Sequence, residues 1–303
     1  MGKKALLLSL AVAVYVLFTG FKPTYEMSSG TPGEVPAFEL KTPVRIALVL
    51  GGGGSKGLAH LGAIQELEAA GIRPDLIVGC SAGSIVGALY ADDPALQGVE
   101  KTLLSLTRSH LLDLTFLKSR FGWVEGKALQ SFMSKNLRSK TFDELKIPLI
   151  VIATDLYSGD AVELSHKEIS TAVGASCAYP GIFKPVFLYE RYLIDGGASN
   201  PIPVEVARKY GAEIVIAIDV SEKLPSVMPY HFFGIAKRGV DIMYRRLVEQ
   251  SLTQADISIR MEFQNVGMFS DHLNHQMYQQ GRLKVRRLLP QIKKLCSRMP
   301  EES

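Results

Sequence analysis

The chain has 303 residues, of which 47% are hydrophobic and 21% charged, and it is long enough to bury a sizeable core without disulfides. The formal net charge of +4 is too mild to favour a nucleic-acid partner, and it does not hinder approach to an anionic lipid surface. The three cysteines, Cys80, Cys177 and Cys296, are too widely spaced for a disulfide framework and match no zinc-binding pattern.

Residues 1–26 have the layout of an export signal. Lys3 and Lys4 precede an uncharged apolar run over residues 5–20, and a polar stretch follows it. The run is slightly long for a signal peptide and short for a full membrane span of about 20 residues. A cleaved signal peptide and a retained N-terminal membrane anchor are therefore both open, with a buried core helix as the plainer alternative. Residues 27–43, rich in Pro, Gly, Ser and Thr, are predicted to be a linker.

Residues 44–303 are predicted to form one domain, in which apolar runs alternate with segments of helical periodicity. The expected strands cover residues 44–50, 75–78, 147–154, 161–164, 186–188, 192–194, 213–220 and 257–261. The expected helices cover residues 58–70, 84–90, two or three segments within 93–137, then 170–177, 203–210 and 276–296. Because the longer strands are continuous apolar runs separated by helices, we expect an α/β fold whose largely parallel sheet is covered on both faces.

A glycine run joins the first strand to the first helix, in the order Gly51-Gly52-Gly53-Gly54-Ser55-Lys56-Gly57. Successive backbone N–H groups and a helix N-terminus favour an anion there. An oxyanion hole for an acyl intermediate would use such a loop, and so would a dinucleotide pyrophosphate, since the run also fits G-x-G-x-x-G. The dinucleotide interpretation expects an acidic residue at the end of the next strand, and none stands there. Lys56 fits either a charge beside the loop or a solvated lysine at the helix start.

A G-x-S-x-G pattern lies between the second expected strand and the helix after it, as Gly79-Cys80-Ser81-Ala82-Gly83. In this setting the serine occupies a sharp strand-to-helix turn that lifts its hydroxyl out of the sheet. The flanking glycines allow the neighbouring backbone to approach closely. Ser81 is therefore a candidate nucleophile, and a glycine-rich turn with a capping serine is the alternative.

The candidate base is an aspartate at the end of a short strand, in Asp195-Gly196-Gly197. None of the six histidines follows a strand in a glycine-rich loop, as the histidine of a catalytic triad would. An aspartate base remains, and Asp195 is the best placed because two glycines free its carboxylate to reach a neighbouring loop. Asp155 and Asp219 also end strands and are weaker candidates. A plain Asp-Gly turn is the alternative for Asp195.

These three motifs in this order resemble the patatin-like phospholipase family, and more closely its bacterial branch related to neuropathy target esterase. The resemblance covers residues 44–220, the motif-bearing core, and includes residues 153–156, 175–183 and 200–203. It implies a three-layer α/β/α fold with a mainly parallel central sheet, a Ser81–Asp195 dyad, and no metal or organic cofactor. It further implies an oxyanion hole and supporting motif positions, which are Gly52, Gly53 and Gly54, then Lys56, Gly57, Gly79, Gly83, Gly196 and Gly197.

The activity that the resemblance implies is hydrolysis of carboxylic esters of membrane lipids through an acyl-enzyme, of esterase, lysophospholipase or phospholipase A type. The expected partners are a phospholipid or lysophospholipid and a membrane surface. The expected location is the bacterial cell envelope, exported or membrane-anchored, and the periplasmic side if the signal is cleaved. The rival interpretations are a nucleotide binder that uses the glycine loop and an envelope-anchored binding protein with an idle site.

Two later segments mix apolar and basic residues. Residues 230–247 fit a lid, an interfacial helix or a surface helix that buries one apolar face. The predicted helix at 276–296 carries a basic face, which is either solvated or in contact with anionic lipid.

Overall fold

The computed structural model describes residues 32–113, 124–224, 226–263 and 266–297. The predicted signal or anchor at residues 1–26 lies outside these ranges, as do residues 27–31 of the predicted linker. Among the helices within them, none is both long enough and apolar enough to cross a membrane.

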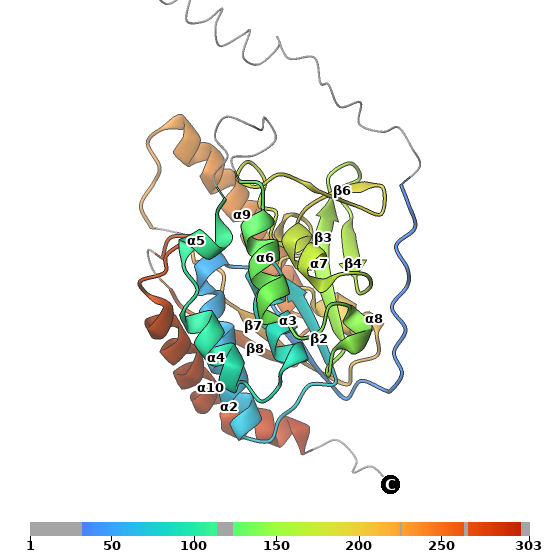
Figure 1. Ribbon diagram of the computed structural model, residues 1–303. Helices are drawn as coiled ribbons and strands as arrows, with labels where there is room; N and C mark the ends of the chain where they lie inside the picture. The colour runs from blue at the N-terminus through green and yellow to red at the C-terminus, as the bar shows by residue number, and fades with distance from the viewer. Residues whose placement is uncertain (1–31, 114–123, 225, 264–265, 298–303) are drawn as a thin grey trace, which may run out of the picture. The chain divides into compact units, whose positions relative to one another are not determined.

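A single mixed sheet runs through the part of the chain that is described from Glu34 onward (Figure 1). Its order is β5-β6-β3-β2-β1-β7-β8, with β4 paired to β3. Neighbouring strands are parallel from β3 through β2, β1 and β7 to β8. The pairs β3–β4, β3–β6 and β5–β6 are antiparallel. The strands are β1 Ile46–Leu50, β2 Leu76–Cys80, β3 Leu149–Asp155, β4 Ala161–Leu164, β5 Val186–Leu188, β6 Arg191–Asp195, β7 Ile214–Asp219 and β8 Ile257–Arg260.

Helices cover both faces of this sheet. The α-helices are α2 Leu58–Ala69, α3 Ala82–Asp92, α4 Gln97–Leu104, α5 Arg108–Leu111, α6 Lys127–Asn136, α7 Ile169–Ser176, α8 Val204–Lys209, α9 Phe232–Leu252 and α10 Asn274–Cys296. Short 3-10 turns are η1 Gly54–Gly57, η2 Phe142–Glu144 and η3 Gly196–Ala198. The predicted α/β fold with a mainly parallel central sheet is confirmed.

The side chains of β1 show why the fold has three layers. Ile46, Leu48 and Leu50 belong to one hydrophobic cluster with α2, α3, α4, α6, α7 and α10. Ala47 and Val49 belong to the opposite cluster, with α8 and the buried end of α9. Because successive side chains of a strand point to opposite faces, a continuous apolar run requires cover on both sides.

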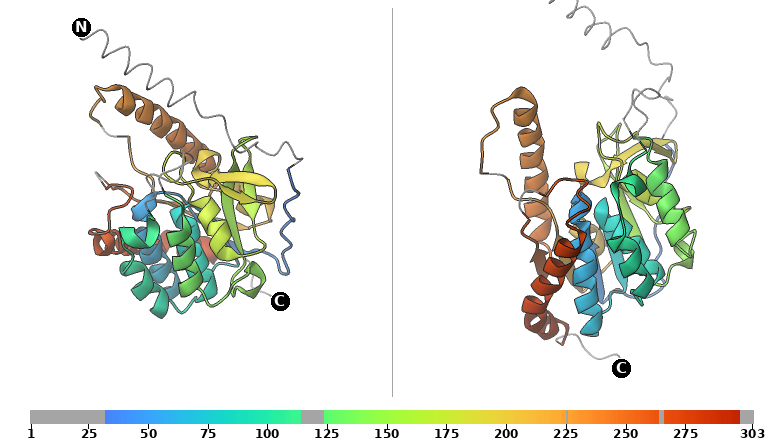
Figure 2. Two further views of the ribbon diagram at one scale, coloured as in Figure 1. Left: turned by 45° about the horizontal axis from the view of Figure 1, so that its top comes forward. Right: turned by 60° about the vertical axis from the view of Figure 1, so that its left-hand side comes forward.

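A close crossing of α2 and α10 ties the end of the chain to the start of the domain, and the two helices lie side by side (Figure 2). A Cβ atom on Gly62 would lie 2.0 Å from the carbonyl oxygen of Tyr278, and one on Gly281 would lie 2.1 Å from that of Ala59. Glu66 of α2 also accepts hydrogen bonds from two arginines of α10, Arg282 at 2.6 Å and Arg286 at 2.8 Å. The basic face predicted for α10 is therefore partly engaged with α2.

This crossing predicts that Gly281→Ala destabilises the fold by about 2 kcal/mol or more, because the added methyl group forces two backbones apart. Gly239→Ala in α9 is the matched control. Its Cβ would meet nothing within 4 Å, so the better helix propensity should stabilise the protein by about 0.5–1 kcal/mol. Chemical denaturation of the full-length protein measures both. Equal stability of the two variants would contradict the close crossing.

Candidate active site

Ser81 occupies a strained turn between β2, which ends at Cys80, and α3, which begins at Ala82. Its backbone has φ 50° and ψ −122°, a conformation that costs a non-glycine residue about 1–3 kcal/mol. The flanking glycines make the turn possible. A Cβ on Gly83 would lie 2.0 Å from the carbonyl oxygen of Leu50, and one on Gly79 would lie 2.8 Å from the Ser84 Cα. The turn therefore presents the Ser81 side chain at the carboxyl end of the parallel strands.

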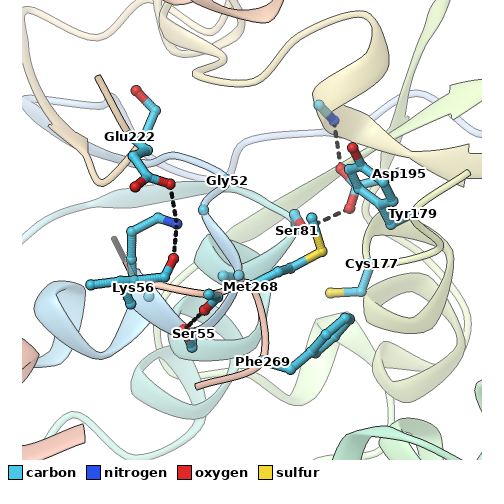
Figure 3. A pocket seen from close by; sticks show the side chains of 18 of the residues that line it. Gly52, Ser55, Lys56, Ser81, Cys177, Tyr179, Asp195, Glu222, Met268 and Phe269 are labelled. Atoms are coloured by element: carbon cyan, nitrogen blue, oxygen red, sulfur yellow. Dashed lines mark hydrogen bonds and ion pairs between the residues drawn. The ribbon is translucent and has the colours of Figure 1, made fainter. Parts of the chain in front are cut away.

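Asp195 meets Ser81 across the sheet (Figure 3). The Ser81 hydroxyl donates to Oδ2 of Asp195 at 2.6 Å, and the Gly197 N–H donates to Oδ1 at 2.7 Å. The register of β6 with β3 pairs Asp195 with Ala153, and the Asp195 backbone oxygen accepts from the Thr154 hydroxyl at 2.9 Å. Both carboxylate oxygens are thus engaged and the side chain has one orientation.

Burial sets the electrostatics of Asp195, which is only 6% exposed. Desolvation raises its pKa from 3.8 to about 6, although the hydrogen bonds from Ser81 and Gly197 act in the opposite direction. A carboxylate with this pKa is ionised at neutral pH and is a better proton acceptor than an ordinary aspartate.

The other candidate bases are engaged elsewhere. Asp155 forms an ion pair with Arg191 at 2.6 Å, and Asp219 forms one with Arg245 at 3.2 Å. All six histidines lie within the described ranges, and none of them lines the cavity around Ser81. His60 is buried with Nε2 2.8 Å from the Gly51 oxygen, and burial lowers its pKa to about 4, so that it is neutral. Only Asp195 among these residues contacts the serine.

Of the three amides predicted for the oxyanion hole, one already has a backbone acceptor within the fold. The Gly52 N–H donates to the carbonyl oxygen of Pro201 at 3.0 Å, so this amide is already occupied. In the described part of the chain, the N–H groups of Gly53 and Gly54 have no such acceptor. Gly54 has φ +60°, and a Cβ there would lie 2.6 Å from the Met268 oxygen. Position 54 therefore needs glycine. The backbone N–H groups of Gly53 and Gly54 remain candidates for binding an anion.

Lys56 is not a solvated lysine at the helix start, because it is buried. Its ammonium lies 3.8 Å from the Glu222 carboxylate and donates to the Val266 oxygen at 3.4 Å. The pKa of Lys56 is lowered chiefly by burial, with Glu222 opposing this effect. The neighbouring Ser55 donates through its N–H to Met268 and through its hydroxyl to Gly267, both at 2.8 Å (Figure 3). Residues 266–269, which the sequence did not single out, are thereby fastened to the glycine loop.

A cavity of about 600 Å³ opens beside Ser81 and Asp195. Apolar side chains of three helices line it, with Ile85 from α3, Leu103 from α4 and Leu129 from α6, and Met268 and Phe269 add to them. Lysine and carboxylate side chains also contribute to the lining, which includes Lys56, Lys223, Lys237, Glu222 and Asp241. The cavity thus offers an apolar compartment next to a serine hydroxyl, with charged groups among its walls.

A sequence model of patatin-like phospholipases matches residues 48–208, just over half of the chain, and this stretch contains both Ser81 and Asp195. The chain belongs to the patatin-like phospholipase family. Patatin-like phospholipase domain-containing protein 6 of Mus musculus is 35% identical over 189 residues, which are 59% of this chain and 14% of the mouse protein. An uncharacterized NTE family protein of Mycobacterium tuberculosis is 31% identical over 179 residues, 58% of this chain and 49% of that protein.

The chain therefore spans only a small part of the mouse protein and about half of the mycobacterial one. Among solved structures, VipD from Legionella pneumophila aligns with a TM-score of 0.55 at 15% identity, covering 82% of this chain and 67% of that one. This likeness places the chain in the patatin fold.

The raised pKa of Asp195 predicts a pH-dependent stability difference between wild type and Asp195→Asn. The ionised carboxylate is disfavoured in the folded state, so wild type loses stability as pH rises from about 4 to about 6. The penalty is ~3 kcal/mol and is complete above pH 6, whereas asparagine carries no charge to bury. Denaturation curves at pH 4, 5, 6 and 7.5 should show the variant gaining relative to wild type up to pH 6. A relative stability that falls with pH would refute the burial argument.

Proposed function

We propose that the chain is a serine lipid acyl hydrolase, which cleaves carboxylic esters of membrane lipids as an esterase, lysophospholipase or phospholipase A. The observation that carries this proposal is the 2.6 Å hydrogen bond from Ser81 to the buried carboxylate of Asp195, at the wall of a largely apolar cavity. Family membership supports a lipid ester as the substrate. The cavity lining supports an acyl chain, which is the apolar part of such an ester.

In the proposed reaction, Ser81 Oγ attacks the ester carbonyl while its proton passes to Asp195 Oδ2. The negative charge on the carbonyl oxygen is stabilised by the N–H groups of Gly53 and Gly54 and by the N-terminus of α3, at which Ser81 stands. When the carbon–oxygen ester bond breaks, Asp195 returns the proton to the leaving alcohol or lysolipid. Water then attacks the acyl-enzyme with Asp195 again as base, which releases the fatty acid and regenerates Ser81.

The apolar N-terminal run bears on where the protein acts. We propose a phospholipid or lysophospholipid substrate at a membrane surface, and a location in the cell envelope, exported or membrane-anchored. The apolar run within residues 1–26 supports this location.

Labelling with a fluorescent fluorophosphonate tests the assignment of Ser81 and Asp195. Wild type should label, because the reagent phosphonylates an activated serine. Ser81→Ala should not label at all, and Asp195→Asn should label at least about 100-fold more slowly, since the general base is lost. Circular dichroism of each variant checks that it is folded. A wild-type protein that stays unlabelled in detergent and on vesicles would favour the binding protein with an idle site.

The pKa of Asp195 also predicts the pH dependence of catalysis. The ionised carboxylate is the active form, so kcat/KM for a soluble ester should rise tenfold per pH unit below the pKa and level off above about pH 6. The residual activity of Asp195→Asn should lack this rise, because asparagine does not titrate. An activity that decreases from pH 5 to pH 7 in wild type would rule out Asp195 as the base.

A further inference from the structure

The loop before helix α9 and the first turn of that helix together form an exposed apolar tip. We define the tip as residues 226–235, which combine the end of a loop with the first turn of the helix. Six large apolar side chains are between 59% and 92% exposed within these ten residues, namely Val227, Met228, Tyr230, Phe232, Phe233 and Ile235. Large contiguous apolar patches are rare on soluble proteins and mark sites of interaction with a protein, a ligand or a membrane.

The tip is held in a definite shape by local contacts. The Arg238 guanidinium donates to the Val227 oxygen at 2.7 Å, which fixes the loop against the helix. His231 caps the helix, because its Nδ1 accepts from the Gly234 N–H at 3.0 Å. The rings of Phe232 and Phe233 meet edge to face with their centroids 5.4 Å apart. These contacts order the tip without burying its apolar groups.

Helix α9 carries this tip away from the body of the domain (Figure 2). Within the helix, only Val248 and Leu252 near its end are buried. The first half therefore does not bury an apolar face against the sheet, which was the plainest of the interpretations of this segment. Its exposed apolar groups need another partner to be removed from water.

The same helix reaches the candidate active site. Lys237, Val240, Asp241 and Tyr244 line the cavity, and the Tyr244 hydroxyl donates to the Gly52 oxygen at 3.0 Å. From Phe232 to Tyr244 the helix advances about 18 Å at its ordinary rise per residue. One rigid element thus connects the tip to the glycine loop.

We propose that the tip inserts into the interfacial region of an anionic phospholipid membrane and holds the cavity at the lipid surface. Aromatic and aliphatic side chains followed by basic ones are the composition of interfacial segments, and Lys237 and Arg238 come directly after the apolar residues. The net charge of the chain is positive and does not oppose approach to anionic lipid. This inference rests on the proposed function, because it supplies the route by which a lipid ester reaches Ser81.

A second apolar site lies at the same edge of the sheet. Leu156 and Tyr157 directly follow β3 and are 47% and 82% exposed. Because β3 is parallel to β2, these residues lie at the sheet edge where Ser81 follows β2. The carboxyl end of the parallel strands, where the candidate active site lies, therefore also exposes the apolar side chains of Leu156 and Tyr157.

Tryptophan fluorescence of the full-length protein tests the insertion directly. Phe233→Trp is introduced into the Ser81→Ala background, so that lipid turnover does not alter the vesicles. Leu283→Trp on α10 is the matched control, since Leu283 is a half-exposed apolar residue that also neighbours basic ones. The vesicles contain phosphatidylcholine with brominated acyl chains and phosphatidylglycerol. The spectrum of Ser81→Ala protein without either change is subtracted.

If the tip inserts, the emission of the tryptophan at position 233 shifts to the blue and is quenched by the brominated lipid, while that at position 283 is not. Omitting phosphatidylglycerol should raise the lipid concentration for half-maximal quenching by roughly tenfold. Quenching at position 233 that is no stronger than at position 283 overturns the proposal, even if the N-terminal segment attaches the protein to vesicles. A blue shift without lipid that grows with protein concentration overturns it in favour of a second copy of the chain.

Hydrolysis gives an independent readout. In Phe232→Ser/Phe233→Ser, the ratio of vesicle-lipid hydrolysis to soluble-ester hydrolysis should fall about tenfold or more. An unchanged ratio overturns the proposal. If wild type hydrolyses neither substrate, the proposed function fails, but the quenching measurement still decides whether the tip binds membranes.

Discussion

The strained backbone of Ser81, with its positive φ, is the constraint on which the candidate site depends. A residue in this conformation persists only when its surroundings over-determine it. Here the Ser81 N–H donates to the Ser176 hydroxyl at 2.8 Å, and Ser176 in turn donates to the carbonyl oxygen of Ile152 at 2.6 Å. On the other side of the turn, the Ser84 hydroxyl donates to the Ser81 oxygen at 2.6 Å. Strand β3 and helices α3 and α7 thus hold one turn, so that the serine hydroxyl faces Asp195 before any substrate arrives.

The buried, ionised carboxylate of Asp195 lowers the stability of the folded protein at neutral pH. Asp195 is 114 residues from Ser81 in the chain and arrives on β6, which turns back antiparallel against β3. A Cβ on Gly196 would lie 2.3 Å from the Ile152 oxygen, so the aspartate can sit deep in the sheet only because glycine follows it. The same burial that destabilises the ionised carboxylate raises its basicity. Stability and reactivity are therefore opposed at this one residue.

Much of the fold could be predicted from the sequence, because continuous apolar runs marked the parallel strands to within two residues of their observed ends. The strand–turn–helix setting of Ser81 was also visible, and its catalytic role stays a prediction. What the sequence did not contain were contacts between distant segments. The Gly52 amide is occupied by Pro201, Lys56 is buried against Glu222 and Val266, and Asp155 is paired with Arg191. Each depends on a partner from another part of the chain, and no local pattern encodes it.

The close packing of α2 and α10 at Gly62 and Gly281 limits where the chain can be truncated without loss of the fold. The family match ends at residue 208, before β7, β8 and α10. Yet β7 pairs with β1 along its whole length, and α10 supports the helix that begins directly after the glycine loop. A fragment cut at the end of the family match would leave one edge of β1 unpaired and the side of α2 that packs against α10 uncovered. The smallest autonomous unit of this protein is thus larger than its recognisable motifs, and transplanting the motif region alone into another scaffold would not transplant the site.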